Sequence, residues 1–463
     1  MALRPFPLRP TRAQQWLIAL MLLALLTHLA LCWHGLHQDD PLSFFSRPDT
    51  SGYLTPARSL AAGRGYTAPD GTPHCERVPG YPATLAAGLA AGGEGHPSLL
   101  LFGFGIIAVL TAIPVYRLAR LFAGERTALL AAALFLFHPT VIGNRPLLLS
   151  DTFFAFVAAW QVFWIVRFYR ERRSRDFLLA MAAAAVGTLI RPIGSAWWFP
   201  ALFWLAVLPG LPWRRKLALG AAGGLLFAAI LFPWMARNAA CGAGYSLDTN
   251  TGAMYHQNGA MLLARVNRSS YEAEKAKILA ELEREFADRD RYPDEAAKTR
   301  YRLARFRALI AAHPWIWISQ HFRPQVLLPD FPAIAENLGL TTANRGTLDV
   351  MQREGVWAAV RHYFADAPAL PFLLAPLLLP ALAAAVGFAA EVVFRLRGFR
   401  REWPLLLLLL AVTEYYFFLP GPITVPRYQL PALPAIAAFG ALGCKRLYTV
   451  LSQWWRRRSS SVR

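Results

Sequence analysis

Long apolar runs separated by clusters of lysine and arginine constrain the fold of this sequence most. Several runs exceed about 18 apolar residues, enough for a helix to cross the roughly 30 Å hydrocarbon layer of a bilayer. With 56% hydrophobic and 16% charged residues, the 463-residue chain is too apolar for a soluble enzyme of its length. The sequence therefore predicts an all-α polytopic membrane protein. Ten helices are predicted, at residues 15–36, 97–120, 126–143, 150–167, 176–190, 193–210, 216–236, 368–394, 403–420 and 427–446.

Lysine and arginine cluster directly after these runs, on one side of the predicted bundle. Cytoplasmic loops carry an excess of Lys and Arg, so the pattern places both termini in the cytoplasm and residues 37–96 and 237–367 outside it. The opposite short segments carry far fewer basic residues. The clusters are Arg4, Arg9 and Arg12; Arg117, Arg120 and Arg126; Arg167 to Arg175; Arg214 to Lys216; Arg395 to Arg401; and the tail from Lys445.

The predicted helices divide the chain into five parts. These are 1–36 with the tail and first helix, 37–96 as the first outer loop, 97–236 with helices two to seven, 237–367 as a long second loop, and 368–463 with the last three helices and a basic tail. Periodicity in the loops predicts short juxtamembrane helices near 53–62 and 82–91, a turn-rich stretch at 241–259, and amphipathic helices at 271–287 and 296–312. Trp315 and Trp317 predict an edge among lipid headgroups.

Charge and cysteine content exclude several classes of function. The formal charge of +20 lies in clusters that lack the interleaved aromatic residues of a nucleic-acid platform, so no nucleic-acid partner is expected. None of the four cysteines shows C-x-x-C spacing, which argues against a zinc site or a disulfide framework. No cofactor is expected, and the sequence leaves a requirement for a divalent metal open. Cys75 and Cys241 both fall on the predicted oxidising side, where the sequence leaves open whether they pair or stay free.

A carboxylate and an arginine stand close together in the first loop. Asp49 begins the segment Asp-Thr-Ser-Gly-Tyr, and Arg77 begins Arg-Val-Pro-Gly-Tyr-Pro. An ordinary exposed loop aspartate is the plain interpretation, but a helical pattern after Asp49 and rigid prolines after Arg77 would fix both side chains at the membrane surface. A fixed carboxylate can act as a general base, and a nearby cation can stabilise a departing phosphate. These two residues therefore predict a reaction centre.

Three further charged residues fall on the same predicted face. Asp151 follows Ser150 at the start of the fourth helix, where capping of that helix is the alternative to a functional role. Arg191 and Arg427 stand at helix ends, where reaching to the lipid interface is the alternative. Together with Arg77 they would suit an anionic phosphate, which guanidinium groups bind in a bidentate geometry.

Short motifs follow one another in a characteristic order along most of the chain. They are Asp49-Thr-Ser-Gly-Tyr53, Gly63-Arg-Gly-Tyr66, Arg77-Val-Pro-Gly-Tyr-Pro82, Leu149-Ser-Asp-Thr152, Leu189-Ile-Arg-Pro192, Pro233-Trp-Met-Ala-Arg-Asn238, Asp248-Thr-Asn-Thr-Gly252 and Arg427-Tyr-Gln-Leu-Pro-Ala-Leu-Pro434. In this ordered set the chain resembles bacterial lipid-carrier-dependent glycosyltransferases of the GT-C class. Within that class it is similar to the family 39 relatives, the protein O-mannosyltransferases and aminoarabinose transferases.

The resemblance implies a GT-C-like bundle of about ten transmembrane helices and a sugar donor on a polyprenyl phosphate such as undecaprenyl phosphate. Asp49 matches the catalytic aspartate of the first loop, and Arg77 matches the basic residue near the donor phosphate. Asp151 matches the second acidic position, which is often Glu in relatives and is one methylene shorter here. Arg191 and Arg427 are expected to help bind the donor phosphate. The implied reaction is an inverting displacement.

The same resemblance implies a setting and partners. It places the chain in a bacterial inner membrane, as a monomer among membrane lipids, with its active site on the periplasmic side. The acceptor is a glycan, a lipid or a protein of the cell envelope. Tyr53, Tyr81 and Asn250 lie within the matching stretches and are expected to contact the substrate.

Two other classes of function stay open at the level of sequence. A polytopic transporter or lipid flippase would use Asp49 as an entrance charge and would need ionisable residues near the bilayer midplane, which are largely missing from the predicted helices. A non-catalytic assembly subunit would tolerate exchange of Asp49 and of Arg77.

The predicted topology is testable by labelling. A single cysteine at Ser269 should react in intact cells with a membrane-impermeant maleimide, whereas one at Ser460 should react only after the membrane is permeabilised. Labelling at Ser460 in intact cells would reverse the orientation.

Overall fold

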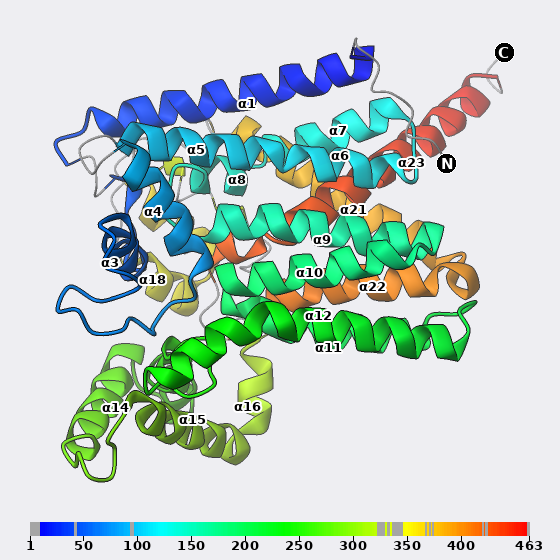
Figure 1. The fold of residues 1–463 in the computed structure, drawn as a ribbon. Helices are drawn as coiled ribbons and strands as arrows, with labels where there is room; N and C mark the ends of the chain where they lie inside the picture. Colours follow the sequence, from blue (N-terminus) through cyan, green and yellow to red (C-terminus); the bar gives the residue numbers. More distant parts are fainter. Residues whose placement is uncertain are drawn as a thin grey trace.

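The computed structural model describes residues 10–40, 44–92, 97–321, 329–330, 334–335, 346–365, 368–369, 372, 375–418, 421 and 425–460. Over these residues it is almost wholly helical, with one isolated bridge between Thr67 and Pro73 and no named strand. Five described helices are long and apolar enough to cross a membrane, and further apolar helices run beside them (Figure 1). The predicted all-α membrane fold is therefore confirmed.

Each predicted apolar run corresponds to a helix of the bundle. The helices run back and forth along one direction, as expected for segments long enough to span a bilayer (Figure 1). They are α1 (Arg12–Leu36), α5 (Pro97–Leu110) with α6 (Ala112–Arg120), α7 (Glu125–Leu136), α9 (Asp151–Glu171), α10 (Ser174–Ile190), α11 (Trp198–Val207), α12 (Trp213–Ala240), α21 (Leu379–Leu396), α22 (Phe399–Phe418) and α23 (Leu433–Ser460).

The helix predicted at 126–143 is broken, and proline is the reason. α7 ends at Leu136, and a separate short helix, α8 (Pro139–Asn144), follows. Pro139 has no N–H to continue the hydrogen-bond ladder. The ring of His138 caps the new helix instead, with its Nδ1 accepting from the backbone N–H of Thr140 at 3.2 Å.

Three other predicted boundaries shift where short 3₁₀ turns precede the α-helices. These turns are η1 (Pro192–Trp197) before α11, η5 (Ala375–Leu378) before α21 and η6 (Pro426–Gln429) before α23. Part of the predicted span at 368–374 lies outside the described residues. The last helix runs past the predicted residue 446 to Ser460, so the basic tail is helical over that length.

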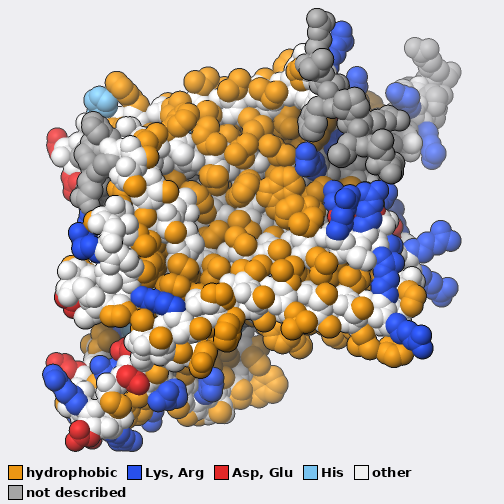
Figure 2. All heavy atoms as spheres, viewed as in Figure 1, with side chains coloured by type: hydrophobic (Ala, Val, Ile, Leu, Met, Phe, Trp, Pro, Cys, Tyr) orange, Lys and Arg blue, Asp and Glu red, His pale blue; other side chains and the backbone are white. Residues whose placement is uncertain are grey.

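The two ends of the bundle differ in composition. α1 begins and α23 ends at the right of Figure 1, whereas the loop helices α3 (Thr50–Ala61) and α4 (Gly80–Gly92) lie at the opposite end. Figure 2 shows Lys and Arg gathered where α9 ends and α12 begins, and hydrophobic side chains over the middle of the visible face. The Lys and Arg residues at this end are among those from which the sequence predicts the cytoplasmic side. The orientation itself stays a prediction.

The long second loop contributes a small helical unit of its own. It contains α13 (Ala260–Val266), α14 (Tyr271–Glu285), α15 (Glu295–Ala312) and α16 (Pro314–Ser319), at the lower left of Figure 1. α14 and α15 lie where the sequence predicts them, and Ser270 and Asp294 cap their first turns. Two further helices, α18 (Thr347–Glu354) and α19 (Val356–Tyr363), follow. Trp315 is 79% exposed, and its expected contact with headgroups stays a prediction.

Glycines allow α21 and α23 to touch backbone to backbone. A Cβ at Gly443 would lie 1.8 Å from the carbonyl oxygen of Gly387, and one at Gly440 would lie 2.5 Å from that of Ala384. Nearer the basic end, the fully buried Glu391 pairs with Arg395 at 2.7 Å and with Arg446 at 2.8 Å. Close packing of small residues is a common source of helix association in membranes.

We expect Gly443→Val to destabilise the protein, because the new side chain would force α21 and α23 apart. Overpacking typically costs about 1–3 kcal/mol, which should appear as a lower thermal midpoint in detergent. Gly224→Val in α12 is the matched control, since a Cβ there meets nothing within 4 Å. Equal midpoints for the two variants would contradict the account of this contact.

Candidate functional site

Asp49 lies between two arginines from distant parts of the chain. Its Oδ1 accepts a hydrogen bond from Arg77 Nη2 at 3.0 Å, and its Oδ2 accepts one from Arg427 Nη2 at 3.0 Å. The residue occupies the N-cap position of α3 but makes no side-chain capping bond. The carboxylate is 42% exposed, while the two arginine side chains are only 19% and 18% exposed. An ordinary loop aspartate would not be held in this way.

Local sequence explains how Arg77 reaches Asp49. A Cβ at Gly52 would lie 3.0 Å from Arg77 Nε, so the glycine leaves room for the guanidinium beside α3. The guanidinium carbon lies 4.7 Å from the ring centre of Tyr53, within cation–π range. The hydroxyl of Tyr66 donates to the backbone carbonyl of Arg77 at 2.9 Å and fixes the loop segment that carries it.

A third ion pair joins Asp151 to Arg191. Asp151 starts α9, and its side chain is only 4% exposed. Arg191 follows α10 in an extended conformation, as expected for a residue before proline, and its Nη1 donates to Asp151 Oδ1. Ser150 makes no side-chain cap; its hydroxyl lies 3.2 Å from that of Tyr53. Ser150 therefore does not cap α9 through its side chain, while Asp151 lies in the first turn of α9 and is engaged by Arg191; a functional role for Asp151 stays a prediction.

Tyr428 lies near both Arg191 and Arg427. The guanidinium carbons of Arg191 and Arg427 lie 5.5 Å and 5.8 Å from its ring centre. The structure thus brings together five of the predicted site residues, with three positive charges against two negative ones. Such an excess favours an anion as ligand.

Neighbouring charges decide the ionisation of Asp49. Burial alone would raise the pKa of this carboxyl, but the positive charges of Arg77, Arg427 and Arg191 outweigh it and hold the pKa below its ordinary value. Asp248 also lies in the field of Arg77, and burial raises the pKa of its carboxyl. Within the described part of the chain, Arg427 Nε is buried and has no hydrogen-bond partner. This arginine therefore has one donor that its contacts with the described residues leave unused.

Tyr81 supports the site from beneath. It is fully buried, and its ring meets that of Tyr53 edge-on at 5.0 Å between centres. Phe104 and Phe153 pack against its other sides. Among the described residues its hydroxyl is buried without a hydrogen-bond partner. Tyr53, itself buried, is thereby held under Arg77. The expected substrate contacts of both tyrosines stay predictions.

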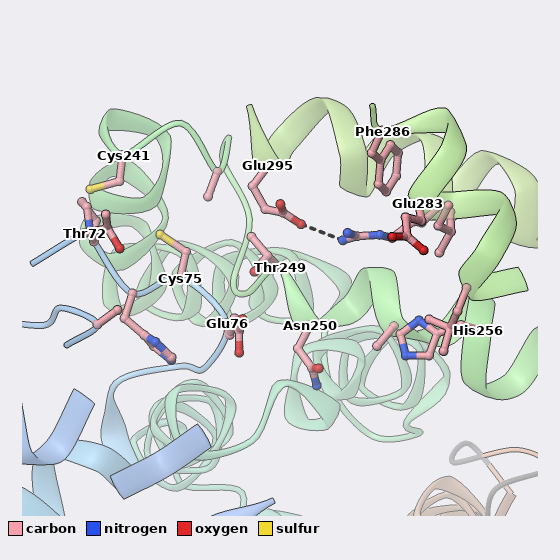
Figure 3. Close-up of a pocket in the computed structure, with 18 of the residues that line it drawn as sticks. Thr72, Cys75, Glu76, Cys241, Thr249, Asn250, His256, Glu283, Phe286 and Glu295 are labelled. Carbon is pink, nitrogen blue, oxygen red and sulfur yellow. Dashed lines mark hydrogen bonds and ion pairs between the residues drawn. The ribbon is translucent and has the colours of Figure 1, made fainter. Parts of the chain in front are cut away.

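Asn250 lies apart from these three ion pairs, in a cavity of about 870 Å³ between the first loop and the second (Figure 3). Cys75, Glu76 and Cys241 also line this cavity, and both cysteines are free thiols. Glu76 precedes Arg77, so the cavity and the Asp49 site share one loop segment. The expected contact of Asn250 with substrate stays a prediction. No group of three or more described His, Cys, Asp or Glu residues is placed to hold a metal.

Arg237 and Asn238 organise the site from a distance, and sequence reasoning missed their role. Arg237 donates to the carbonyl oxygens of Tyr66 and His74, both at 2.7 Å, and so stabilises the first loop. Asn238 donates to the carbonyl of Leu247 at 3.2 Å in the second loop. Adjacent residues at the end of α12 thus tie the two loops together. The signal available was a pair of polar residues closing a long apolar helix.

Comparisons with known proteins agree with the predicted resemblance. Residues 76–236 match the family model described as dolichyl-phosphate-mannose-protein mannosyltransferase, which is less than half of the chain. This range includes Arg77, Asp151 and Arg191 but not Asp49 or Arg427. No match is found among curated proteins.

Solved oligosaccharyltransferase structures share the fold at low sequence identity. The archaeal oligosaccharyltransferase AglB from Archaeoglobus fulgidus, in complex with an inhibitory peptide and a dolichol-phosphate, matches with a TM-score of 0.52 and 16% identity, over 97% of this chain and 52% of that one. An apo oligosaccharyltransferase from Archaeoglobus fulgidus gives 0.52 and 15% identity, over 97% and 52%. ArnT from Cupriavidus metallidurans, bound to undecaprenyl phosphate, gives 0.46 and 13% identity, over 93% and 60%.

The chain spans about half the length of the oligosaccharyltransferases it matches. The family match and the shared fold, taken together, confirm the resemblance of this chain to GT-C class glycosyltransferases.

Proposed function

We propose that this chain is a membrane glycosyltransferase that moves a sugar from a polyprenyl-phosphate donor to an acceptor outside the cytoplasm. The observation that carries the proposal is the carboxylate of Asp49 held between Arg77 and Arg427 at the end of the bundle opposite the basic clusters. A polyprenyl donor keeps its tail in lipid while its phosphate and sugar reach the surface. A reaction centre for it belongs at a helix-bundle end rather than at the midplane.

The chemistry assigned to this site is a single displacement. Asp49 takes the proton from the acceptor hydroxyl or amine as that group attacks the anomeric carbon. The bond from this carbon to the phosphate oxygen breaks, and the phosphate leaves with the electron pair, inverting the carbon. Arg77 and Arg427 stabilise the leaving phosphate through charge-assisted hydrogen bonds. Asp151 holds Arg191 beside them.

Setting and partners follow from the same proposal. The donor is a polyprenyl-phosphate sugar, the acceptor is an envelope glycan, lipid or protein, and the surroundings are the lipids of a bacterial inner membrane. The active site faces the periplasm, and the chain acts as a monomer. The match to the mannosyltransferase family model over residues 76–236 supports this reading over that of a transporter or flippase.

The first test replaces the base. Asp49→Asn should lower sugar transfer by about 10²–10⁴-fold, the usual contribution of a positioned general base, while folding and donor binding persist. Transfer is measured with radiolabelled polyprenyl-phosphate sugar in membranes, and folding is checked by size-exclusion profile. Transfer at a near wild-type rate would remove Asp49 as the base and make Asp151 the next candidate.

A second test separates phosphate recognition by Arg77 from simple attraction. Arg77→Lys keeps the charge but loses the planar pair of donors, so a bidentate role predicts donor or transition-state binding weaker by about ten- to a hundredfold. Arg77→Ala should be worse, because it removes the charge as well. Donor affinity and transfer rate are measured for both variants in nanodiscs. Full activity of the lysine variant would reduce Arg77 to a point charge, and full activity of both would exclude it.

A further inference from the structure

We propose that the donor phosphate displaces Asp49 from Arg77 and Arg427, so that the carboxylate is released to act as a base only when the donor is bound. This inference rests on the proposed function and concerns how the same site is regulated. It makes the two arginines a shared cradle that holds either the Asp49 carboxylate or the phosphate.

Both oxygens of Asp49 are engaged in the unliganded site. Each accepts from a different guanidinium at 3.0 Å, so the carboxylate is held from two sides. A carboxylate held by two cations has its ionised form stabilised and is a weak base. The position of its pKa below the ordinary value agrees with this geometry. In this arrangement Asp49 is poorly suited to remove a proton from an acceptor.

The same nitrogen atoms are the natural ligands of a phosphate. Guanidinium groups bind phosphate through two parallel N–H donors. Arg427 gives only Nη2 to Asp49, and its Nε is buried and unpartnered within the described chain. A phosphate oxygen pair that took both nitrogens would satisfy this orphan donor, whose burial otherwise carries a desolvation cost. Arg427 thus uses only one of these two donors in the unliganded site, and a bound phosphate would engage both.

Exposure indicates which member of the cluster moves. The Asp49 side chain is 42% exposed, whereas Arg77 and Arg427 are 19% and 18% exposed. Arg77 is also held against the ring of Tyr53. The carboxylate is therefore the member that can turn towards solvent, while the arginines stay in place. A phosphodiester carries one negative charge, so the exchange leaves the charge around the arginines unchanged.

The neighbouring pair provides a fixed frame for the exchange. Asp151 is only 4% exposed and stays bound to Arg191, so it does not compete for the phosphate. The charged groups that face Asp49 are thus Arg77 and Arg427 in direct contact, with Arg191 farther away. The consequence is an order of events, in which donor binding precedes activation of the acceptor.

The test measures whether removing the Asp49 charge raises or lowers the affinity for a lipid phosphate. A higher affinity indicates that Asp49 competes for the arginines, and a lower one that it preorganises them. If Asp49 competes for the arginines, Asp49→Asn should bind undecaprenyl phosphate about three- to tenfold more tightly than wild type, the range expected when two partly exposed ion pairs no longer have to break. If Asp49 instead preorganises the arginines, the same variant should bind more weakly. Affinity is measured by thermophoresis on the full-length protein in nanodiscs.

Three further variants make the result specific. Asp49→Ser, smaller and neutral, should show the same gain, and Asp49→Glu, which keeps the charge, should not. Glu402→Gln is the matched control, because Glu402 has a similar exposure of 37% and pairs with Arg395, away from the Asp49 site and from the cavity of Asn250. It should leave the affinity unchanged. A gain in Asp49→Glu, or an equal gain in Glu402→Gln, would overturn the proposal, as would unchanged or weaker binding by both neutral variants.

The measurements distinguish a failure of the proposed exchange from a failure of the proposed transferase function. Tighter lipid-phosphate binding without any sugar transfer by wild type would support the exchange and reject the transferase assignment. Loss of transfer in Asp49→Asn together with unchanged or weaker phosphate binding would retain the transferase assignment and reject the exchange.

Discussion

The contact of Asp49 with Arg77 and Arg427 is the constraint on which the site depends. It joins the first loop to the segment before the last helix, across 378 positions of sequence. Neither arginine is placed by this contact alone. Arg77 rests on Tyr53 and belongs to the loop segment fixed by Tyr66, and Arg427 lies over Tyr428. The packed bundle holds the cations, and the carboxylate is the more exposed group between them.

This arrangement explains why charge can persist at a surface that is otherwise apolar. A lone buried charge is costly, but a cluster that alternates acids and arginines offsets most of that cost through its own contacts. Asp151 and Arg191 form one neutral pair, and Asp49 partly neutralises two further arginines. One positive charge is left over. This excess, with the Arg427 Nε that has no partner among the described residues, is what the proposed phosphate ligand would use.

Hydrophobic periodicity and short motifs predict most of the helices of the described chain. The ten apolar runs recur as helices of the bundle, and the loop helices α3, α4, α14 and α15 lie where the sequence predicts them. The pairing of Asp49 with Arg77 was also foreseeable, because both belong to one short loop. The pairing of Arg427 with Asp49 was not foreseeable, because it depends on how the last helix packs against the first loop. No spacing in the sequence encodes that distance.

Other differences trace to local chemistry that periodicity ignores. Pro139 breaks a run that looks continuous by hydropathy, and the ring of His138 supplies the new cap. Arg237 and Asn238 resemble the polar end of any membrane helix, yet their hydrogen bonds tie the two loops that frame the site. Their partners are backbone carbonyls. Such partners leave no trace in side-chain motifs and become visible only in three dimensions.

The most direct test of the account is an experimental structure of the protein in nanodiscs with undecaprenyl phosphate bound. The account predicts that the phosphate lies between Arg77 and Arg427, that Arg427 Nε donates to it, and that Asp49 has moved beyond about 4 Å from both guanidinium groups, the usual limit of an ion pair. The Asp151–Arg191 pair should remain intact. A phosphate bound elsewhere, with Asp49 still held by both arginines, would contradict the central claim.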